Sequence, residues 1–237
     1  MHNNQTINRH NNRQVYDDVF DKLQTVCTST PKVFDTVDLH FMRENAEVLF
    51  KQVHDPKLLK AVFGKNWNQP ADKNSVSSQT RELKYIEHSK VTVVVSDVET
   101  QEIRKYLPNA VLTRISNIHA DLDSELTPKG FGARSGAVFT GNWNHLPNRD
   151  AVLWFVSEVL PLISPTVDAS FVFHVVGANT MPPEILALNH TQMDGKLRVI
   201  VHGFVEDLKA FYGEMRLSVA PLRWGAGVKG KINSSMK

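Results

Sequence analysis

The sequence predicts an α/β protein built on parallel sheets. Short β-branched runs alternate with amphipathic helical patterns over most of its 237 residues, and this alternation is the signal for βα units. The run VTVVVS (91–96) is apolar at nearly every position, which is typical of a strand covered by helices on both faces. A polar, irregular stretch near the middle of the chain has no apolar period and indicates a linker. We therefore predict a disordered or frayed start (1–30), a first domain (31–117), a linker (118–136) and a second domain (137–237).

The first predicted domain shows one clear strand-helix-strand unit. After the strand 91–96, Ser96 or Asp97 can cap a helix that runs from about Val98 to Tyr106. Pro108 stops this helix, and AVLTRIS (110–116) follows as the next strand.

The second predicted domain contains four strands, which are expected at 137–142, 170–177, 196–203 and 217–222. Between the first two strands, apolar residues recur at three- and four-residue steps from 148 to 163, which predicts a helix with one buried face. A short helix opened by Pro182 and Pro183 and a helix from Asp207 to Met215 fill the other connections. Right-handed crossovers would make this half of a doubly wound sheet, which binds ligands beyond the carboxyl ends of its strands.

Composition excludes several classes of protein. Apolar residues make up 41% of the chain, charged residues 22%, and the net charge is +2, so disorder and a nucleic-acid partner are not expected. No apolar run is long enough to span a membrane. Cys27 is the single cysteine and cannot form an internal disulfide, so we expect a cytoplasmic location.

The segment APLRWGAGVKGK (220–231) is the strongest candidate for a binding loop. It follows a predicted strand and alternates glycines (Gly225, Gly227, Gly230) with cations (Arg223, Lys229, Lys231). Glycines let the backbone approach a ligand closely, and the cations would hold a phosphate, as would a helix opening at Ile232. The alternative is a surface turn with solvated charges.

Two further loops follow strand ends at the same predicted sheet edge. Gly141 and Asn142 begin the turn after the first strand of the second domain, and Asn148 is expected to cap the helix that follows. The turn Gly203, Phe204, Val205 follows the third strand. The three loops are expected to converge on one cleft.

Other polar and aromatic residues receive simpler interpretations. Asp35, Asp38 and His40 follow a predicted strand, but their spacing matches no metal site, so no metal is predicted. His174 is expected to be a hydrogen-bonded core histidine, and Trp224 is a candidate cover for a base or sugar.

Several motifs in order resemble a known family. FTGNWNHLPNRDAVLWFVSEVLPLI, VVGAN, VHGFVEDLKAFY and SVAPLRWGAGVKGKI resemble the donor-binding domain of family 4 glycosyltransferases of the GT-B fold. Upstream, VFDTVDLHFMRE, RELKYIEHSKVTVVVSDVE and SNIHA resemble the later part of the acceptor-side domain. The resemblance covers the chain from about residue 31 and implies two facing Rossmann-like domains.

The resemblance implies transfer of a sugar from a nucleoside diphosphate sugar to a glycan, lipid or small-molecule acceptor. It implies retention of the anomeric configuration, with no cofactor and no obligatory metal. By position, Arg223, Gly225, Gly227, Lys229 and Lys231 would bind the diphosphate. Residues 141–142 and 203–205 would line the donor pocket, and His40 would face the acceptor as a candidate catalytic residue.

The chain departs from the family pattern in two ways. Many members carry a pair of glutamates eight positions apart around the phosphate loop, whereas Ala226 to Ser234 contains no carboxylate. Both domains also look incomplete at the chain ends, so we expect slow or no turnover by this chain alone. A non-catalytic nucleotide-binding or scaffolding fragment of the same fold is therefore the alternative. A nicotinamide-dependent oxidoreductase is disfavoured because no GxGxxG follows a first strand.

Overall fold

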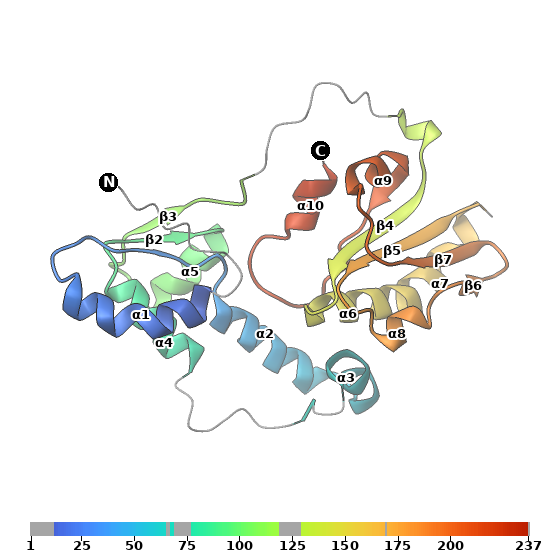
Figure 1. Cartoon of the computed structure of the whole chain (residues 1–237). Helices are drawn as coiled ribbons and strands as arrows, with labels where there is room; N and C mark the ends of the chain where they lie inside the picture. Colours follow the sequence, from blue (N-terminus) through green and yellow to red (C-terminus); the bar gives the residue numbers. More distant parts are fainter. Residues whose placement is uncertain (1–11, 65–66, 69–76, 119–128, 169, 237) are drawn as a thin grey trace. The chain divides into compact units, whose positions relative to one another are not determined.

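The structure is a computed structural model of the chain, and it describes residues 12–64, 67–68, 77–118, 129–168 and 170–236 (Figure 1). Contacts divide it into two compact units. Unit 1 comprises Met1–Val37 and Val76–Ile115, and unit 2 comprises Asp38–Ser75 and Ser116–Lys237. Within the described ranges, no helix combines the length and the apolarity needed to span a membrane.

Unit 1 is a three-stranded parallel sheet with helices around it. The strands β1 (Val33–Asp35), β2 (Val91–Val94) and β3 (Leu112–Arg114) lie in the order β1-β2-β3. The helices are α1 (Asn12–Val26), α4 (Ser78–Glu87) and α5 (Asp97–Tyr106). As predicted, α5 ends before Pro108, and the hydroxyl of Ser96 caps it by accepting a hydrogen bond from the Glu99 amide (3.3 Å).

The start of the chain differs from the prediction. A frayed segment was expected over residues 1–30; residues 1–11 lie outside the described ranges, but Asn12–Val26 forms α1. The helix is held by Phe20, which is 2% exposed and packs on Tyr85 of α4 at a centroid distance of 4.7 Å. His88 also meets the Phe20 ring edge-on and Lys84 lies over it, so Phe20 anchors α1 to α4.

Unit 2 contains a five-stranded sheet in the order β6-β7-β5-β4-β8. Its strands are β4 (Ser135–Asn142), β5 (Val172–Ala178), β6 (Gln192–Met193), β7 (Leu197–His202) and β8 (Met215–Ser218). Neighbouring strands are parallel except for β6, which pairs antiparallel with β7. The predicted α/β class with parallel sheets is therefore confirmed.

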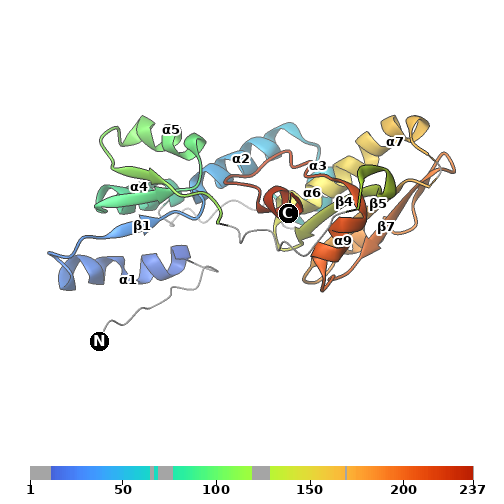
Figure 2. The ribbon, with the colours of Figure 1, turned by 90° about the horizontal axis from the view of Figure 1, so that it is seen from above.

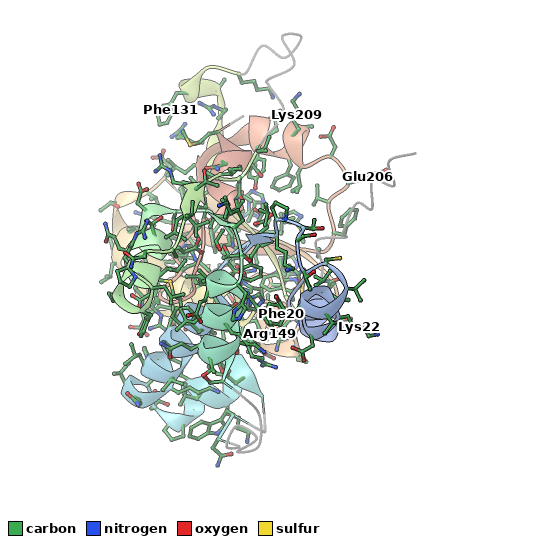
Figure 3. All side chains as sticks on the ribbon, turned by 90° about the vertical axis from the view of Figure 1, so that its left-hand side faces the viewer. Phe20, Lys22, Phe131, Arg149, Glu206 and Lys209 are labelled. Atoms are coloured by element: carbon green, nitrogen blue, oxygen red, sulfur yellow. The ribbon has the colours of Figure 1, made fainter. Side chains whose placement is uncertain are left out.

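Helices cover both faces of this sheet (Figures 1 and 2). On one face, α6 (Leu146–Trp154), α7 (Leu160–Ile163) and α8 (Pro183–Leu186) enclose the main core. On the other face, α9 (Leu208–Glu214) packs through Phe211 and Tyr212 onto Val138 and Val176. Glu206 and Lys209 lie on the outer side of this segment (Figure 3) and are exposed. The short 3₁₀ turns η1 (Phe131–Ala133) and η3 (Ser164–Thr166) and the helix α10 (Gly230–Ser235) complete the unit.

The long helix predicted over 148–163 begins two residues earlier, at Leu146, and is not uniform. A π-helical turn, η2 (Phe155–Val159), separates α6 from α7, and the Leu160 amide donates to the carbonyl of Phe155. Pro161 follows directly and has no amide hydrogen, so the regular bonding pattern cannot continue through it. Val152, Val156 and Leu160 still share one buried face, as predicted.

The boundary between the units also differs from the predicted one. Residues 31–117 were expected to form one domain, but α2 (His40–Val53) and α3 (Pro56–Phe63) belong to unit 2. The reason is an apolar cluster in which Phe50, Leu59 and Val62 pack against Trp224. The predicted linker is shortened as well, since β4 begins at Ser135; residues 119–128 of it lie outside the described ranges.

The last predicted strand, 217–222, is displaced toward the amino terminus. Strand β8 covers Met215–Ser218, and the Val219 amide just beyond it donates to β4, at the carbonyl of Val138 (2.9 Å). Pro221 cannot donate to a strand ladder, so the chain leaves the sheet before it.

Candidate functional site

A cavity of about 270 Å³ opens at the carboxyl ends of β4 and β5 in unit 2. Strand ends, the loop after β7 and the first residue of α9 form most of its wall. Its lining consists of Thr140, Gly141, Asn142, Asn148, Val176, Gly177, Ala178, Phe204, Val205, Leu208 and Lys231. This is the edge at which ligands of parallel α/β sheets bind.

Five predicted site residues line this cavity: Gly141, Asn142, Phe204, Val205 and Lys231. Gly203, Arg223, Gly225, Gly227, Lys229 and His40 do not contribute to the lining. The carbonyl of Gly203 instead accepts a hydrogen bond from the Gly177 amide (3.4 Å), which ties the loop after β7 to the end of β5. The predicted convergence of loops therefore holds for the loops after β4 and β7 and for Lys231.

Lys231 is the basic side chain among the lining residues. Its Nζ donates to Asn148 Oδ1 (2.7 Å) and lies 4.0 Å from the centroid of the Phe139 ring. An ammonium has three N–H donors, and the described residues provide it with one hydrogen-bond acceptor and no carboxylate. Burial, followed by the nearby charge of Lys229, lowers the pKa of Lys231 to about 7. An anion in the cavity would favour its charged form.

Three asparagines fix the turn after β4. The side-chain oxygen of Asn142 accepts from the Asn144 amide (2.8 Å) and from Asn179 Nδ2 (2.7 Å). Asn148 is 4% exposed, and its Nδ2 donates to the carbonyl of Asn142 (2.8 Å). Asn148 was predicted to cap α6, but it lies inside the helix and instead connects this turn to Lys231.

The predicted phosphate loop has positive φ angles at two of its glycines. Gly225 and Gly227 have φ angles of 127° and 69°, which side-chain-bearing residues rarely adopt. A Cβ on Gly227 would lie 3.0 Å from Cβ of Asp38, and one on Gly225 would lie 3.8 Å from Pro147. The loop therefore packs closely against both the start of α2 and the start of α6.

Lys229 belongs to a mixed cluster of charges around this loop. Its Nζ donates to the carbonyl of Ala226 (2.9 Å). Burial lowers its pKa, the neighbouring Asp38 acts in the opposite direction, and Arg43 lowers it further. Asp38 is itself paired with Arg43 at 3.2 Å. Asp38 thus places a carboxylate beside a loop whose own sequence has none.

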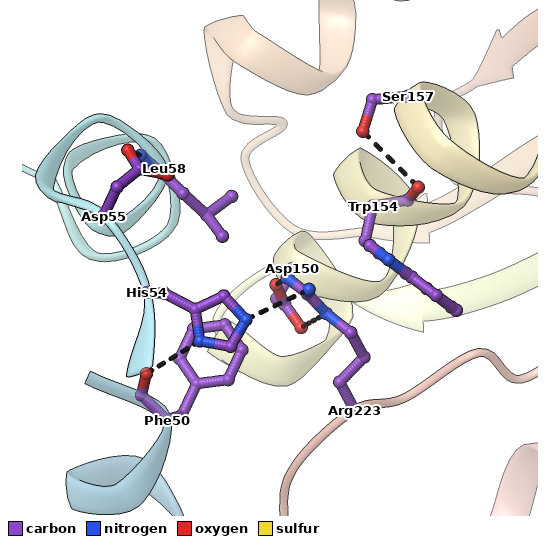
Figure 4. A network of polar contacts seen from close by, with 8 residues as sticks. All are labelled: Phe50, His54, Asp55, Leu58, Asp150, Trp154, Ser157 and Arg223. Atoms are coloured by element: carbon purple, nitrogen blue, oxygen red, sulfur yellow. Dashed lines mark hydrogen bonds and ion pairs between the residues drawn. The ribbon is translucent and has the colours of Figure 1, made fainter. Parts of the chain in front are cut away.

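Arg223 does not face the cavity and is part of a structural network (Figure 4). It forms a two-pronged ion pair with Asp150 of α6, one prong of which joins Nε to Oδ2 at 3.1 Å, and the side chain of Asp150 is fully buried. Its Nη1 lies 3.2 Å from Nε2 of His54, and its guanidinium packs over the rings of Phe50 and Trp154. The predicted role of Arg223 in diphosphate binding is therefore not supported by its position.

The two tryptophans in the predicted loops are core residues. Trp143 is fully buried and packs on Phe139, as expected of a core tryptophan. Trp224, a candidate cover for a base or sugar, is 8% exposed and stacks on Phe63 with ring centroids 5.6 Å apart. It anchors α3 and is not available to stack on a ligand.

The segment 35–40 forms a strand end and a helix start. Asp35 ends β1, its Oδ1 accepts a hydrogen bond from the Val37 amide (3.0 Å), and His40 is the first residue of α2. Within the described ranges, no group of three or more His, Cys, Asp or Glu residues is placed to hold a metal ion.

His174 forms a polar contact that its sequence context only partly indicates. Its Nδ1 lies 2.9 Å from Nε2 of His202 on the adjacent strand β7, and both rings meet the edge of Phe211. Burial, then His202 and Arg198, lower the pKa of His174 to about 4. The predicted hydrogen bond of His174 is confirmed, with a second histidine as its partner, but the side chain is half-buried and not part of the core.

This pair predicts a loss of stability in mild acid. An unfolded histidine gains a proton below about pH 6.5, whereas folded His174 stays neutral to about pH 4, so the unfolded state binds more protons in that window. We expect the free energy of unfolding to fall by at most about 3 kcal/mol between these pH values. Urea denaturation of His174→Gln should show a shallower pH dependence than the wild type. The exposed His190→Asn serves as the control, and an unchanged slope in H174Q would contradict the prediction.

Sequence reasoning missed several residues of this site. Val176, Gly177 and Ala178 follow the same strand-end rule as the predicted loops, so the motif VVGA could have indicated them. No local signal indicates that Arg43 and Asp38 lie beside the phosphate loop, because they are almost 190 residues away from it in the chain.

Comparison with known proteins identifies the segment that contains most of this site. Residues 134–237 match the family model described as "Glycosyl transferases group 1". These residues are similar to group 1 glycosyltransferases. The match covers the cavity, the loop 223–231 and Asp150, and it leaves out α2 and α3.

The chain also resembles a solved structure, that of TarM. The TM-score is 0.50 at 14% sequence identity, and the likeness covers 71% of this chain and 32% of the TarM chain. It supports the GT-B architecture expected from the sequence. The chain thus spans about a third of the length of this structural neighbour. No curated protein matches the chain in sequence.

Proposed function

We propose that the protein transfers a sugar from a nucleoside diphosphate sugar to an acceptor, as a member of glycosyltransferase family 4. The observation that carries the proposal is the position of the Lys231 ammonium. It lines the cavity at the carboxyl end of the sheet, within the segment that matches the group 1 family, and it has no carboxylate partner among the described residues. A cavity with a cation that no carboxylate neutralises is suited to an anionic group such as a phosphate.

The rest of the cavity suits the other part of a nucleotide. Val176, Val205 and Leu208 provide apolar walls, and Phe204 is 77% exposed at the lining, where its ring is available to stack on a base. Gly141 also lines the cavity, and a Cβ there would lie 2.9 Å from Asn148 and Phe139, so a glycine is needed for these side chains to pack beside the cavity. We propose that the base and ribose lie along this wall and that the diphosphate reaches Lys231.

The reaction breaks the bond between the anomeric carbon and a phosphate oxygen, and negative charge develops on the departing diphosphate. Lys231 and the nearby Lys229 would stabilise this charge without a metal ion. Retention of configuration and a cytoplasmic location belong to the same proposal and rest on the resemblance of the motifs and on the single cysteine.

Replacing Lys231 with methionine tests the proposal. Methionine keeps most of the buried stem and removes the charge, so we expect UDP or GDP to bind about 10- to 100-fold more weakly, as for the loss of a charged hydrogen bond. Isothermal titration calorimetry gives the two dissociation constants. Lys196→Met, which removes an exposed lysine on the β6–β7 turn, is the matched control. Equal affinities for the wild type and K231M would contradict the proposed site.

Sugar transfer itself separates the enzyme from the non-catalytic alternative. The observation that favours the alternative is the lack of a carboxylate in residues 226–234. Nuclear magnetic resonance of the product formed from a labelled donor would report both turnover and the anomeric configuration. Nucleotide binding without transfer to any of a panel of acceptors would favour a nucleotide-binding module.

A further inference from the structure

Asn148 is the residue through which the turn after β4 contacts Lys231. It lies in the first turn of α6, lines the cavity and is 4% exposed. Its Nδ2 donates to the carbonyl of Asn142 (2.8 Å), and its Oδ1 accepts from Lys231 Nζ (2.7 Å). A carbonyl oxygen can only accept a hydrogen bond, and an ammonium can only donate one. The two partners therefore fix which way the amide faces, and one amide side chain satisfies both.

Close packing holds this amide in place. A Cβ on Gly141 would lie 2.9 Å from both Cγ and Nδ2 of Asn148, so the backbone of β4 passes directly beside the amide. The Asn148 backbone amide donates to the carbonyl of His145 (2.9 Å), in the turn that leads into α6. Lys231 comes from α10, 83 residues away in the chain. Asn148 Oδ1 is the hydrogen-bond acceptor that the described residues offer to its ammonium.

The amide holds Lys231 without neutralising it. Asn148 carries no charge, and neither does Phe139, whose ring centroid lies 4.0 Å from Nζ. Among the described titratable groups, Lys229 and His145 interact electrostatically with Lys231, and both are basic. Asn148→Asp would instead place a carboxylate beside Nζ. The resulting ion pair would take up the charge that a phosphate needs.

We propose that Asn148 is a positioning residue of the cavity: it holds the Lys231 side chain in the cavity wall on an uncharged acceptor, so that the positive charge stays available to the diphosphate. The inference rests on the proposed function, because Lys231 can act on a diphosphate only if one occupies the cavity. It assigns to a buried amide of α6 the task of directing a cation that α10 carries.

A double-mutant cycle tests this role through the affinity for UDP, measured by titration calorimetry at pH 7 on the full chain. Asn148→Leu keeps a similar volume and offers no acceptor, so we expect UDP to bind about tenfold more weakly, as after the loss of one hydrogen bond to a charged group. In the Lys231→Met background the same substitution should change the affinity by less than about twofold, because the lysine through which it acts is gone. Equal losses in the two backgrounds would indicate a merely structural role and would overturn the proposal.

Asn148→Asp tests the need for an uncharged acceptor. We expect it to weaken UDP binding about 10- to 100-fold. The Lys231 amine should also titrate about 1–3 pH units higher than in the wild type, because a carboxylate beside it favours the charged form. Nuclear magnetic resonance of labelled lysine Cε, assigned with K231M, follows this titration without any nucleotide. Asn144→Asp is the control, since it adds the same charge to the same turn at an exposed residue outside the cavity lining, and it should leave both measurements unchanged.

The two sets of measurements separate the possible failures. If the wild type binds UDP and K231M weakens it, but both Asn148 variants bind as the wild type does, the role of Asn148 is refuted and the proposed function stands. If the wild type does not bind UDP, the proposed function fails. The Lys231 titration then tests the contact by itself, and an unchanged titration in Asn148→Asp would overturn the contact as well.

Discussion

Replacing Arg223 with alanine should lower the free energy of unfolding by about 3–5 kcal/mol. Its partner Asp150 is fully buried on α6, and the change would leave this carboxylate without its cation. The same substitution removes the contacts to His54 and to the rings of Phe50 and Trp154. Gly225 and the rest of the predicted phosphate loop follow Arg223 closely in the chain. We therefore also expect nucleotide binding to weaken, because the loop is displaced and not because Arg223 itself contacts the nucleotide.

Urea denaturation followed by circular dichroism measures this loss. Arg114→Ala is the matched control, since Arg114 pairs with Asp97 at 2.6 Å but both side chains are more than half exposed. An exposed pair contributes about 1 kcal/mol or less. Adding Asp150→Asn to the Arg223→Ala protein should recover part of the loss, because it removes the uncompensated charge. If Arg223→Ala lowered the free energy of unfolding no more than Arg114→Ala does, the structural role of the Arg223–Asp150 pair would be disproved.

Gly177→Ala is the second substitution for which we expect a large effect. A Cβ at this position would lie 2.1 Å from two atoms of the Trp143 indole ring, and that ring is fully buried in the main core. A rigid aromatic side chain cannot move aside there, so the backbone of β5 must shift. Overpacking of this kind costs about 1–3 kcal/mol and occasionally more. Gly177 also lines the cavity, so the shift should weaken nucleotide binding.

Gly203→Ala is the control, since a Cβ on Gly203 meets no atom within 4 Å. We expect its midpoint of thermal unfolding to stay within about 1 °C of the wild type, while Gly177→Ala lowers the midpoint by about 2–4 °C for each kcal/mol lost. Equal melting temperatures for the two variants would show that the Trp143 indole can move aside to admit the Cβ, which would contradict the prediction.

The sequence predicted the sheet and its loops because those features are local. Periodicity located β2, β4, β5 and β7, and the rule that ligands bind at strand ends placed Gly141, Phe204 and Lys231 at one cavity. The errors at α6 and β8 both adjoin a proline: Pro147 favours an earlier helix start, and Pro221 an earlier strand end.

Other features could not be predicted because they depend on contacts between distant residues. Arg223 was predicted to bind the diphosphate, and its spacing in the sequence does not indicate the contacts with Asp150 and His54, which lie 73 and 169 residues away in the chain. The membership of α2 in unit 2 likewise depends on the packing of Phe50 against Trp224, ring to ring at 5.4 Å. The spacing of cations and glycines predicts an anion-binding loop. It does not predict which of the cations is paired with a carboxylate of the protein itself.

The position of Trp143 gives the protein an optical reporter of its own. The indole is fully buried in the main core, and it packs directly against Gly177, which lines the cavity. Its Nε1 has no hydrogen-bond acceptor among the described residues, so the ring's emission depends on the surrounding electric field and not on a fixed partner. A charged molecule that enters the cavity changes that field, and intrinsic fluorescence can therefore follow its arrival without any added label.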